Sequence, residues 1–155
     1  MRLEISGADL RAALEEGVSL VEDVAGRFPQ VSGLRFVFDA RRPRGSRVLE
    51  VSIGGTPPDP AATYKLATSE YVMAGGDGYA SLTKDRPIVD ASGASLMAAV
   101  VIDYIAARTT VTPGVEGASS SGSESLWLLR HAWRLRSGAT GRGPSFEPVR
   151  LPPRA

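Results

Sequence analysis

The chain has 155 residues, of which 43% are apolar, and this is enough for a single domain with its own core. Its 18 basic and 17 acidic side chains nearly cancel, so no excess of positive charge indicates a nucleic-acid partner. Cysteine is absent, which excludes disulfides, thiolate zinc sites and a cysteine nucleophile. No stretch approaches the roughly 18 apolar residues that a transmembrane segment needs. Residues 1–9 contain acids and no apolar run, so we expect no signal peptide there.

The first 20 residues predict a strand followed by an amphipathic helix. Residues 2–5 alternate polar and apolar side chains, and Ser6 with Asp9 has the spacing of a helix N-cap. The helix that follows has an apolar stripe at positions 10, 13, 14 and 18. Its charged positions 11, 15 and 16 are expected to face solvent.

The middle of the chain predicts strands and a further helix. Residues 34–38 and 47–53 are rich in apolar and β-branched side chains, and a turn with Pro43 and Gly45 separates them, which is typical of a hairpin. In the second strand, positions 49, 51 and 53 are expected on one face and positions 48, 50 and 52 on the other. Residues 54–60 contain two glycines and three prolines and predict a loop, and residues 64–68 predict another strand. Residues 92–108 predict a largely buried helix. Together these elements predict an α+β fold in which amphipathic helices pack on a mixed sheet.

Composition divides the chain into a domain at residues 1–117 and a flexible C-terminal tail at residues 118–155, rich in Ser, Gly, Pro and Arg. Within the tail, residues 126–136 have the pattern of a short basic amphipathic helix for a membrane surface or a protein partner. Eleven residues form only a marginal helix in isolation, so we expect the tail to be poorly ordered.

The histidine content argues against catalysis by this chain alone. A two-metal hydrolase needs several His, Asp and Glu ligands, and a Ser-His-Asp triad needs a histidine base. The sequence has one histidine, His131, which lies in the predicted tail. We therefore expect no catalytic residue, no metal ligand and no cofactor in this chain.

Two segments have residues suited to binding a nucleoside. Phe28 lies between Gly26 and Pro29, and Tyr71 is followed by the glycine-rich turn Gly75-Gly76-Asp77. Aromatic rings stack on nucleobases, glycines allow close approach of the backbone, and a carboxylate accepts hydrogen bonds from ribose hydroxyls. The same residues also suit a hairpin turn and two core aromatics, so spacing alone leaves both interpretations open.

These two segments, in this order and at this separation, resemble the C-terminal domain of the 5'-nucleotidase family. The similar features include the helix at residues 10–15, the segments 26–34 and 71–79, Arg47-Val48, Gly55, Tyr64 and a final helix that ends near residues 115–117. The resemblance covers about residues 1–117.

The resemblance implies a two-domain hydrolase that removes phosphate from nucleotides, often periplasmic or extracellular. It implies that Phe28 and Tyr71 sandwich the base of a nucleoside or nucleotide, and that Asp77, with Gly75 and Gly76, contacts the ribose. Two divalent metals are expected in a separate metallophosphatase domain, which this chain lacks. The chain also lacks the Asn-Gly-Gly-x-Arg segment that opens the family's C-terminal domain, so the resemblance implies a fragment, a split-gene product or a decayed copy.

Three functional hypotheses remain open from the sequence. The first is a nucleotide-recognition domain that acts in nucleotide catabolism together with a metallophosphatase domain. The second is a non-catalytic module for ligand sensing or protein association, and the third is a truncated relic.

Overall fold

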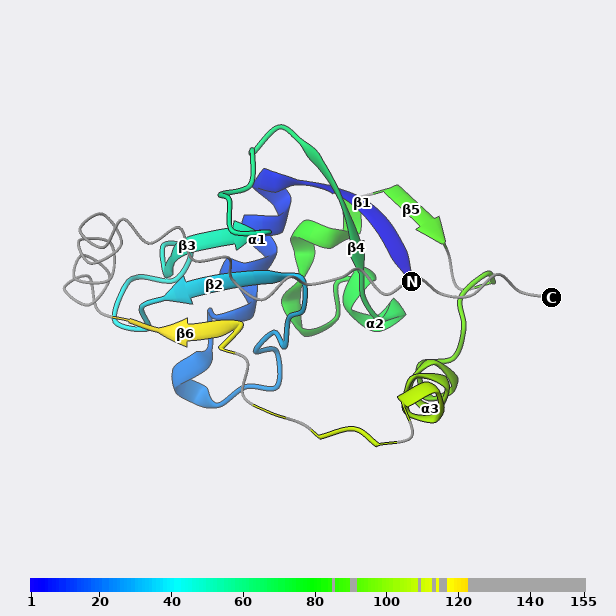
Figure 1. Ribbon diagram of the computed structural model, residues 1–155. Coiled ribbons are helices and arrows are strands. Elements are labelled where there is room, and N and C mark those ends of the chain that lie inside the picture. The colour runs from blue at the N-terminus through cyan, green and yellow to red at the C-terminus, as the bar shows by residue number, and fades with distance from the viewer. Residues whose placement is uncertain (85, 90–91, 109, 113, 115–116, 123–155) are drawn as a thin grey trace. The chain divides into compact units, whose positions relative to one another are not determined.

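The computed structural model describes residues 1–84, 86–89, 92–108, 110–112, 114 and 117–122. The strands form two three-stranded sheets, ordered β4-β1-β5 and β3-β2-β6 (Figure 1). This arrangement confirms the predicted α+β class, although the strands divide between two sheets. The elements in chain order are β1 (Arg2–Ser6), α1 (Gly7–Gly17), the 3-10 helix η1 (Val21–Asp23), β2 (Leu34–Phe38), β3 (Val48–Ile53), β4 (Thr63–Ala67), α2 (Glu70–Met73), the 3-10 helices η2 (Gly76–Gly78) and η3 (Ala80–Lys84), β5 (Arg86–Val89), α3 (Met97–Arg108) and β6 (Ser119–Ser121).

Helix α1 begins at the predicted cap. The Ser6 hydroxyl accepts the Asp9 N–H at 3.0 Å and donates to the Asp9 carboxylate at 2.6 Å. This satisfies one of the backbone donors that the first turn of a helix leaves without a partner. The prediction that β1 runs directly into α1 is confirmed.

Helix α1 contributes side chains to two hydrophobic clusters. In the first cluster, Leu10 packs with Leu3 of β1. In the second, one turn later, Leu14 and Val18 pack with Phe36 of β2. Complete burial of such a side chain contributes about 1.5–3 kcal/mol, so the apolar stripe of α1 joins the two sheets.

Strand β3 departs from the predicted alternation of its side chains. Val48 and Glu50 oppose neighbouring residues of β2, so Leu49 is an extra residue in β3. Because side chains alternate between the two faces of a sheet, an extra residue moves the side chains beyond it to the opposite face. As a result Val48 and Val51, predicted to lie on opposite faces, are both buried in the second cluster.

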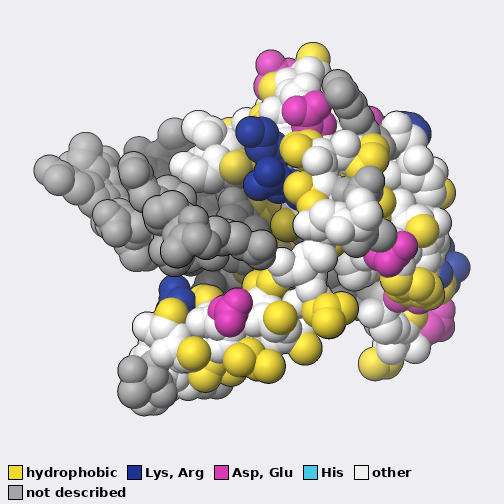
Figure 2. Space-filling view, turned by 90° about the vertical axis from the view of Figure 1, so that its right-hand side faces the viewer, with side chains coloured by type: hydrophobic (Ala, Val, Ile, Leu, Met, Phe, Trp, Pro, Cys, Tyr) yellow, Lys and Arg dark blue, Asp and Glu magenta, His cyan; other side chains and the backbone are white. Residues whose placement is uncertain are grey.

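The end of the described chain also differs from expectation. Helix α3 was predicted to be largely buried, yet its large apolar side chains from Met97 to Ile105 are 45% to 76% exposed, and Figure 2 shows apolar side chains on the surface of the molecule. Strand β6 pairs in parallel with β2, so the compact unit continues to Gly122, beyond the predicted boundary at residue 117. The predicted helix at residues 126–136 and His131 lie outside the described residues.

A buried arginine connects the turn before β3 to the end of α1. Arg47 is 5% exposed, and its guanidinium donates to the carbonyls of Val18 at 2.8 Å and Ser19 at 3.0 Å. The same group donates to the Glu22 carboxylate at 2.6 and 3.0 Å, and its Nε donates to the Arg42 carbonyl at 3.0 Å. Each of the three guanidinium nitrogens of this buried side chain therefore donates to an acceptor of the protein.

We predict that Arg47→Met lowers the free energy of unfolding by about 2–4 kcal/mol, because it leaves buried carbonyls without their donor. The matched control is Arg44→Met. Arg44 pairs with the same Glu22 at 3.0 Å but is 55% exposed, so its loss should cost less than about 1 kcal/mol. Urea denaturation of the three proteins measures both effects, and equal losses would contradict the assignment of Arg47 as a buried anchor.

We also predict that Glu22 makes stability depend on acid pH. The hydrogen bonds from Arg47, followed by a backbone hydrogen bond and Arg44, lower the pKa of Glu22 from 4.5 to about 2. Because the folded state favours the charged form, this stabilisation is present above pH 4.5 and is lost as the pH falls toward 2. Glu22→Gln should therefore flatten the pH dependence of the urea midpoint between pH 5 and 2, and an unchanged slope would contradict the prediction.

Candidate functional site

The ring of Tyr71 rests on the glycine-rich turn that follows α2. Ser69 caps this short helix by accepting the Val72 N–H at 3.3 Å. A Cβ placed on Gly76 would lie 2.6 Å from three ring atoms of Tyr71, so the absence of a side chain lets the ring lie directly on the backbone. Tyr71 is nevertheless 61% exposed. One ring face is therefore supported, and the ring remains accessible for stacking.

Asp77 lies beside this ring and is bonded to its hydroxyl twice. The Tyr71 hydroxyl donates to Asp77 Oδ1 at 3.0 Å and accepts the Asp77 N–H at 3.2 Å. Asp77 has a φ of 54°, a left-handed conformation that aspartate tolerates better than most residues. Within the described part of the chain, no hydrogen bond reaches Oδ2, which leaves this oxygen available to a ligand.

Phe28 is part of an aromatic cluster on the second sheet. Its ring centroid lies 5.6 Å from that of Phe38 and 6.3 Å from that of Phe36, both on β2. The residue is half-buried and packs against the second hydrophobic cluster. Phe28 therefore has a core role, as one of the two sequence interpretations expected, and it keeps part of its surface exposed.

The segment that carries Phe28 is bonded directly to the segment that carries Asp77. The Tyr79 hydroxyl donates to the Arg27 carbonyl at 2.6 Å. In return, the Arg27 guanidinium lies 3.2 to 3.4 Å from where a Cβ of Gly78 would be, and it donates to the Ser19 hydroxyl at 3.0 Å. The fold thus joins two segments that are about 50 residues apart in sequence.

Tyr79 keeps its proton over the whole physiological range. Burial, followed by the negative charges of Asp77 and Glu16, raises its pKa to about 12, against an opposing effect of Arg27. The hydroxyl is therefore a permanent donor to the Arg27 carbonyl.

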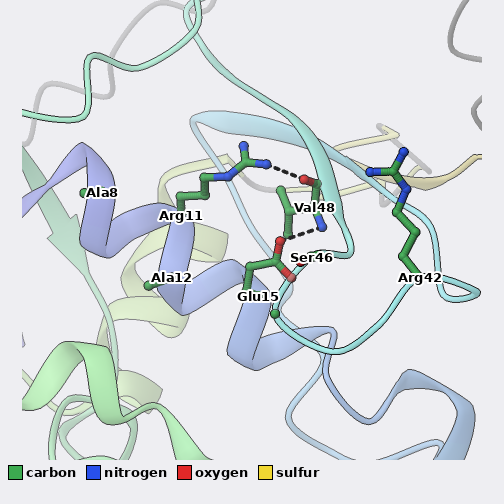
Figure 3. Close-up of a pocket in the computed structure, with 8 residues that line it drawn as sticks. Ala8, Arg11, Ala12, Glu15, Arg42, Ser46 and Val48 are labelled. Atoms are coloured by element: carbon green, nitrogen blue, oxygen red, sulfur yellow. Dashed lines mark hydrogen bonds between the residues drawn. The ribbon is translucent and has the colours of Figure 1, made fainter.

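A hollow of about 410 Å³ lies elsewhere, between α1 and the turn before β3 (Figure 3). In it, Arg11 donates to the Val48 carbonyl and Glu15 accepts the N–H groups of Arg47 at 2.9 Å and Val48 at 2.8 Å. Its lining includes none of the predicted site residues. These polar groups hold the start of β3 against α1, so we assign the hollow a structural role.

The described residues contain neither a metal site nor a transmembrane helix. Over this part of the chain, no three His, Cys, Asp or Glu side chains lie close enough together to bind a metal ion. No helix in the same residues is both long enough and apolar enough to cross a membrane.

The family model of the 5'-nucleotidase C-terminal domain matches residues 1–84, which contain both segments of the site. The chain belongs to this family. The match ends at η3, so it covers β1 to β4 and the glycine-rich turn.

Several curated proteins are similar to this 5'-nucleotidase C-terminal domain. The trifunctional nucleotide phosphoesterase protein YfkN of Bacillus subtilis is 42% identical over 86 residues, which is 52% of this chain and 6% of that protein. The snake venom 5'-nucleotidase of Crotalus adamanteus is 37% identical over 123 residues, covering 74% of this chain and 21% of the venom protein. The chain therefore spans about a fifth or less of these relatives.

Solved structures show the same relationship. The 5'-nucleotidase precursor of Thermus thermophilus has a TM-score of 0.73 and 38% identity, over 79% of this chain and 25% of that chain. The NAD nucleotidase of Haemophilus influenzae has a TM-score of 0.62 at 20% identity, which shows the shared fold, over 79% of this chain and 24% of that chain.

The structure brings most of the predicted site residues into direct contact. Tyr71, Gly76 and Asp77 touch one another, and Gly75 adopts the left-handed φ of 88° that opens the turn. Phe28 lies on the neighbouring segment. Tyr79 and Arg27 had no predicted role, although they lie in the segments 71–79 and 26–34 that carry the predicted site residues.

We predict that Gly76→Ala displaces the Tyr71 ring and breaks its hydrogen bonds to Asp77, because the new Cβ occupies the position of the ring face. The stability cost should be about 1 kcal/mol, since the ring is exposed. NMR shifts of the Tyr71 ring protons and the Asp77 amide measure the displacement. Gly114→Ala, where a Cβ meets nothing within 4 Å, is the control, and equal shifts in both variants would refute the contact.

Proposed function

We propose that this chain is a nucleoside- or nucleotide-recognition domain of a 5'-nucleotidase-type phosphohydrolase. The observation that supports this most strongly is the arrangement of Tyr71, whose ring is supported by Gly76 and is 61% exposed. Such a ring is a stacking platform, and stacking on it contributes about 1–3 kcal/mol per base without strong preference for base identity.

The proposed ligand contacts follow from the groups around this platform. The base stacks on the open face of Tyr71, and Phe28 supplies the second ring from the neighbouring segment. The free Oδ2 of Asp77 accepts hydrogen bonds from the ribose hydroxyls. A charged acceptor is suited to this role because its hydrogen bonds are about twice as strong as neutral ones.

Hydrolysis, in this proposal, requires groups that the described residues do not provide. The match to this chain covers only about a fifth or less of the length of these relatives. The relatives include proteins named 5'-nucleotidases. We propose that a metallophosphatase domain supplies the two divalent metals, in the same polypeptide or as a partner. By the same relationship, we propose periplasmic or extracellular nucleotide catabolism as the setting.

The test is a titration of the full 155-residue chain with adenosine up to millimolar concentration. We expect Tyr71→Ala to weaken binding roughly tenfold or more, since it removes the stacking platform. Phe28→Leu should have a similar effect while it keeps an apolar side chain in the aromatic cluster. Asp77→Asn should reduce discrimination between ribose and deoxyribose, because it removes the charge on the acceptor.

Tyr104→Ala is the matched control, because Tyr104 is also an exposed tyrosine, at 45%, but lies on α3. Its affinity for adenosine should equal that of the unmodified chain. If neither adenosine nor other nucleosides shift the Tyr71 ring resonances in a folded sample, the recognition function is wrong. A role in protein association would then be the better explanation.

A further inference from the structure

Tyr79 occupies the contact between the two arms of the proposed site. It is 7% exposed and belongs to the first hydrophobic cluster. Its hydroxyl donates a hydrogen bond to the Arg27 carbonyl, outside this cluster, at 2.6 Å. Arg27 directly precedes Phe28, and Tyr79 follows Asp77 by two residues. This hydrogen bond therefore joins the Tyr79 side chain to the backbone of the segment that carries Phe28.

Helix α1 forms the floor of this contact. A Cβ on Gly17 would lie 2.7 Å from the Tyr79 hydroxyl and 2.7 Å from Pro29 Cδ. This glycine lets both the tyrosine and the segment after Phe28 approach the helix backbone. The hydroxyl thus lies where three segments of the chain meet.

The Arg27 side chain makes a second connection between the arms. Its guanidinium covers Gly78, next to Asp77, and is held by the Ser19 hydroxyl just beyond α1. The Arg27 carbonyl therefore accepts the hydrogen bond of the Tyr79 hydroxyl, and the Arg27 side chain covers the glycine-rich turn at Gly78. Two independent contacts fix the distance between the arms.

We infer that Tyr79, together with Arg27, is a positioning residue that sets the separation of the Phe28 and Tyr71 rings for a nucleoside. This inference rests on the proposed function. The width of a stacked base fixes the spacing that two platforms need, and displacements of about 1 Å are enough to weaken a preorganised site. A purely structural role would instead affect folding and leave the two rings independent in binding.

Tyr79→Phe tests the inference, because it keeps the buried ring and removes only the hydroxyl. We expect the Kd for adenosine to rise roughly three- to tenfold. The matched control is Tyr64→Phe, which removes a tyrosine hydroxyl that accepts a backbone N–H, that of Asp59, at 2.9 Å. This control should bind adenosine as the unmodified chain does.

A double-mutant cycle with Phe28→Leu separates positioning from stability. If Tyr79 acts by setting the separation of the two rings, Tyr79→Phe should change the Kd less than about twofold once the Phe28 ring is gone. Additive effects in the cycle would overturn the inference. Should Tyr79→Phe not fold, Ser19→Ala carries the same cycle, because it releases the Arg27 guanidinium without altering the first cluster.

The possible outcomes distinguish the inference from the function on which it rests. If Tyr71→Ala loses binding while Tyr79→Phe and Ser19→Ala bind as the unmodified chain does, only the positioning role is refuted. If the unmodified chain binds no nucleoside, both are refuted. Weakened binding in Tyr79→Phe with non-additivity in the cycle supports both.

Discussion

The structure depends on the last turn of α1, where three consecutive residues hold three different segments. Glu15 accepts the two N–H groups at the start of β3. Glu16 accepts the N–H and hydroxyl of Ser81 in η3 at 3.0 and 2.6 Å, and Gly17 lets Pro29, in the segment after Phe28, approach together with Tyr79. Successive residues of a helix project about 100° apart, so one turn can reach all three. The position of the site relative to the core follows from this turn.

The sequence predicted the elements whose cause is local and failed where the cause is distant. The start of α1 follows from Ser6 and Asp9, three residues apart, and was correct. Glu15 and Glu16 were expected to face solvent because they are charged and lie off the apolar stripe. Both instead accept backbone N–H groups of segments 32 to 65 residues away, which helix periodicity does not reveal.

The same distinction applies to the site. Tyr71, Gly76 and Asp77 lie within seven residues, so the motif predicted that they share one site, whereas the contact of the ring with Gly76 and Asp77 emerged only from the structure. Phe28 was harder to interpret, because its packing on β2 depends on a fold that brings the two segments together. The bond from Tyr79 to Arg27 spans 52 residues, and no spacing rule predicts it.

The two arms of the site are held with unequal strength. Phe28 is attached to a cluster that includes fully buried Phe36, so moving its ring would expose apolar surface at about 25 cal/mol per Å². Tyr71 is held by Gly76 and by two exposed hydrogen bonds to Asp77, each with a net contribution of about 1 kcal/mol. A ligand that needed a wider or narrower gap would therefore move Tyr71 before it moved Phe28. In the proposed site, the Phe28 ring is therefore fixed and the Tyr71 ring can adjust its position. Because the Tyr71 hydroxyl bonds to Asp77, any movement of the Tyr71 ring also shifts the carboxylate that is proposed to bind the ribose.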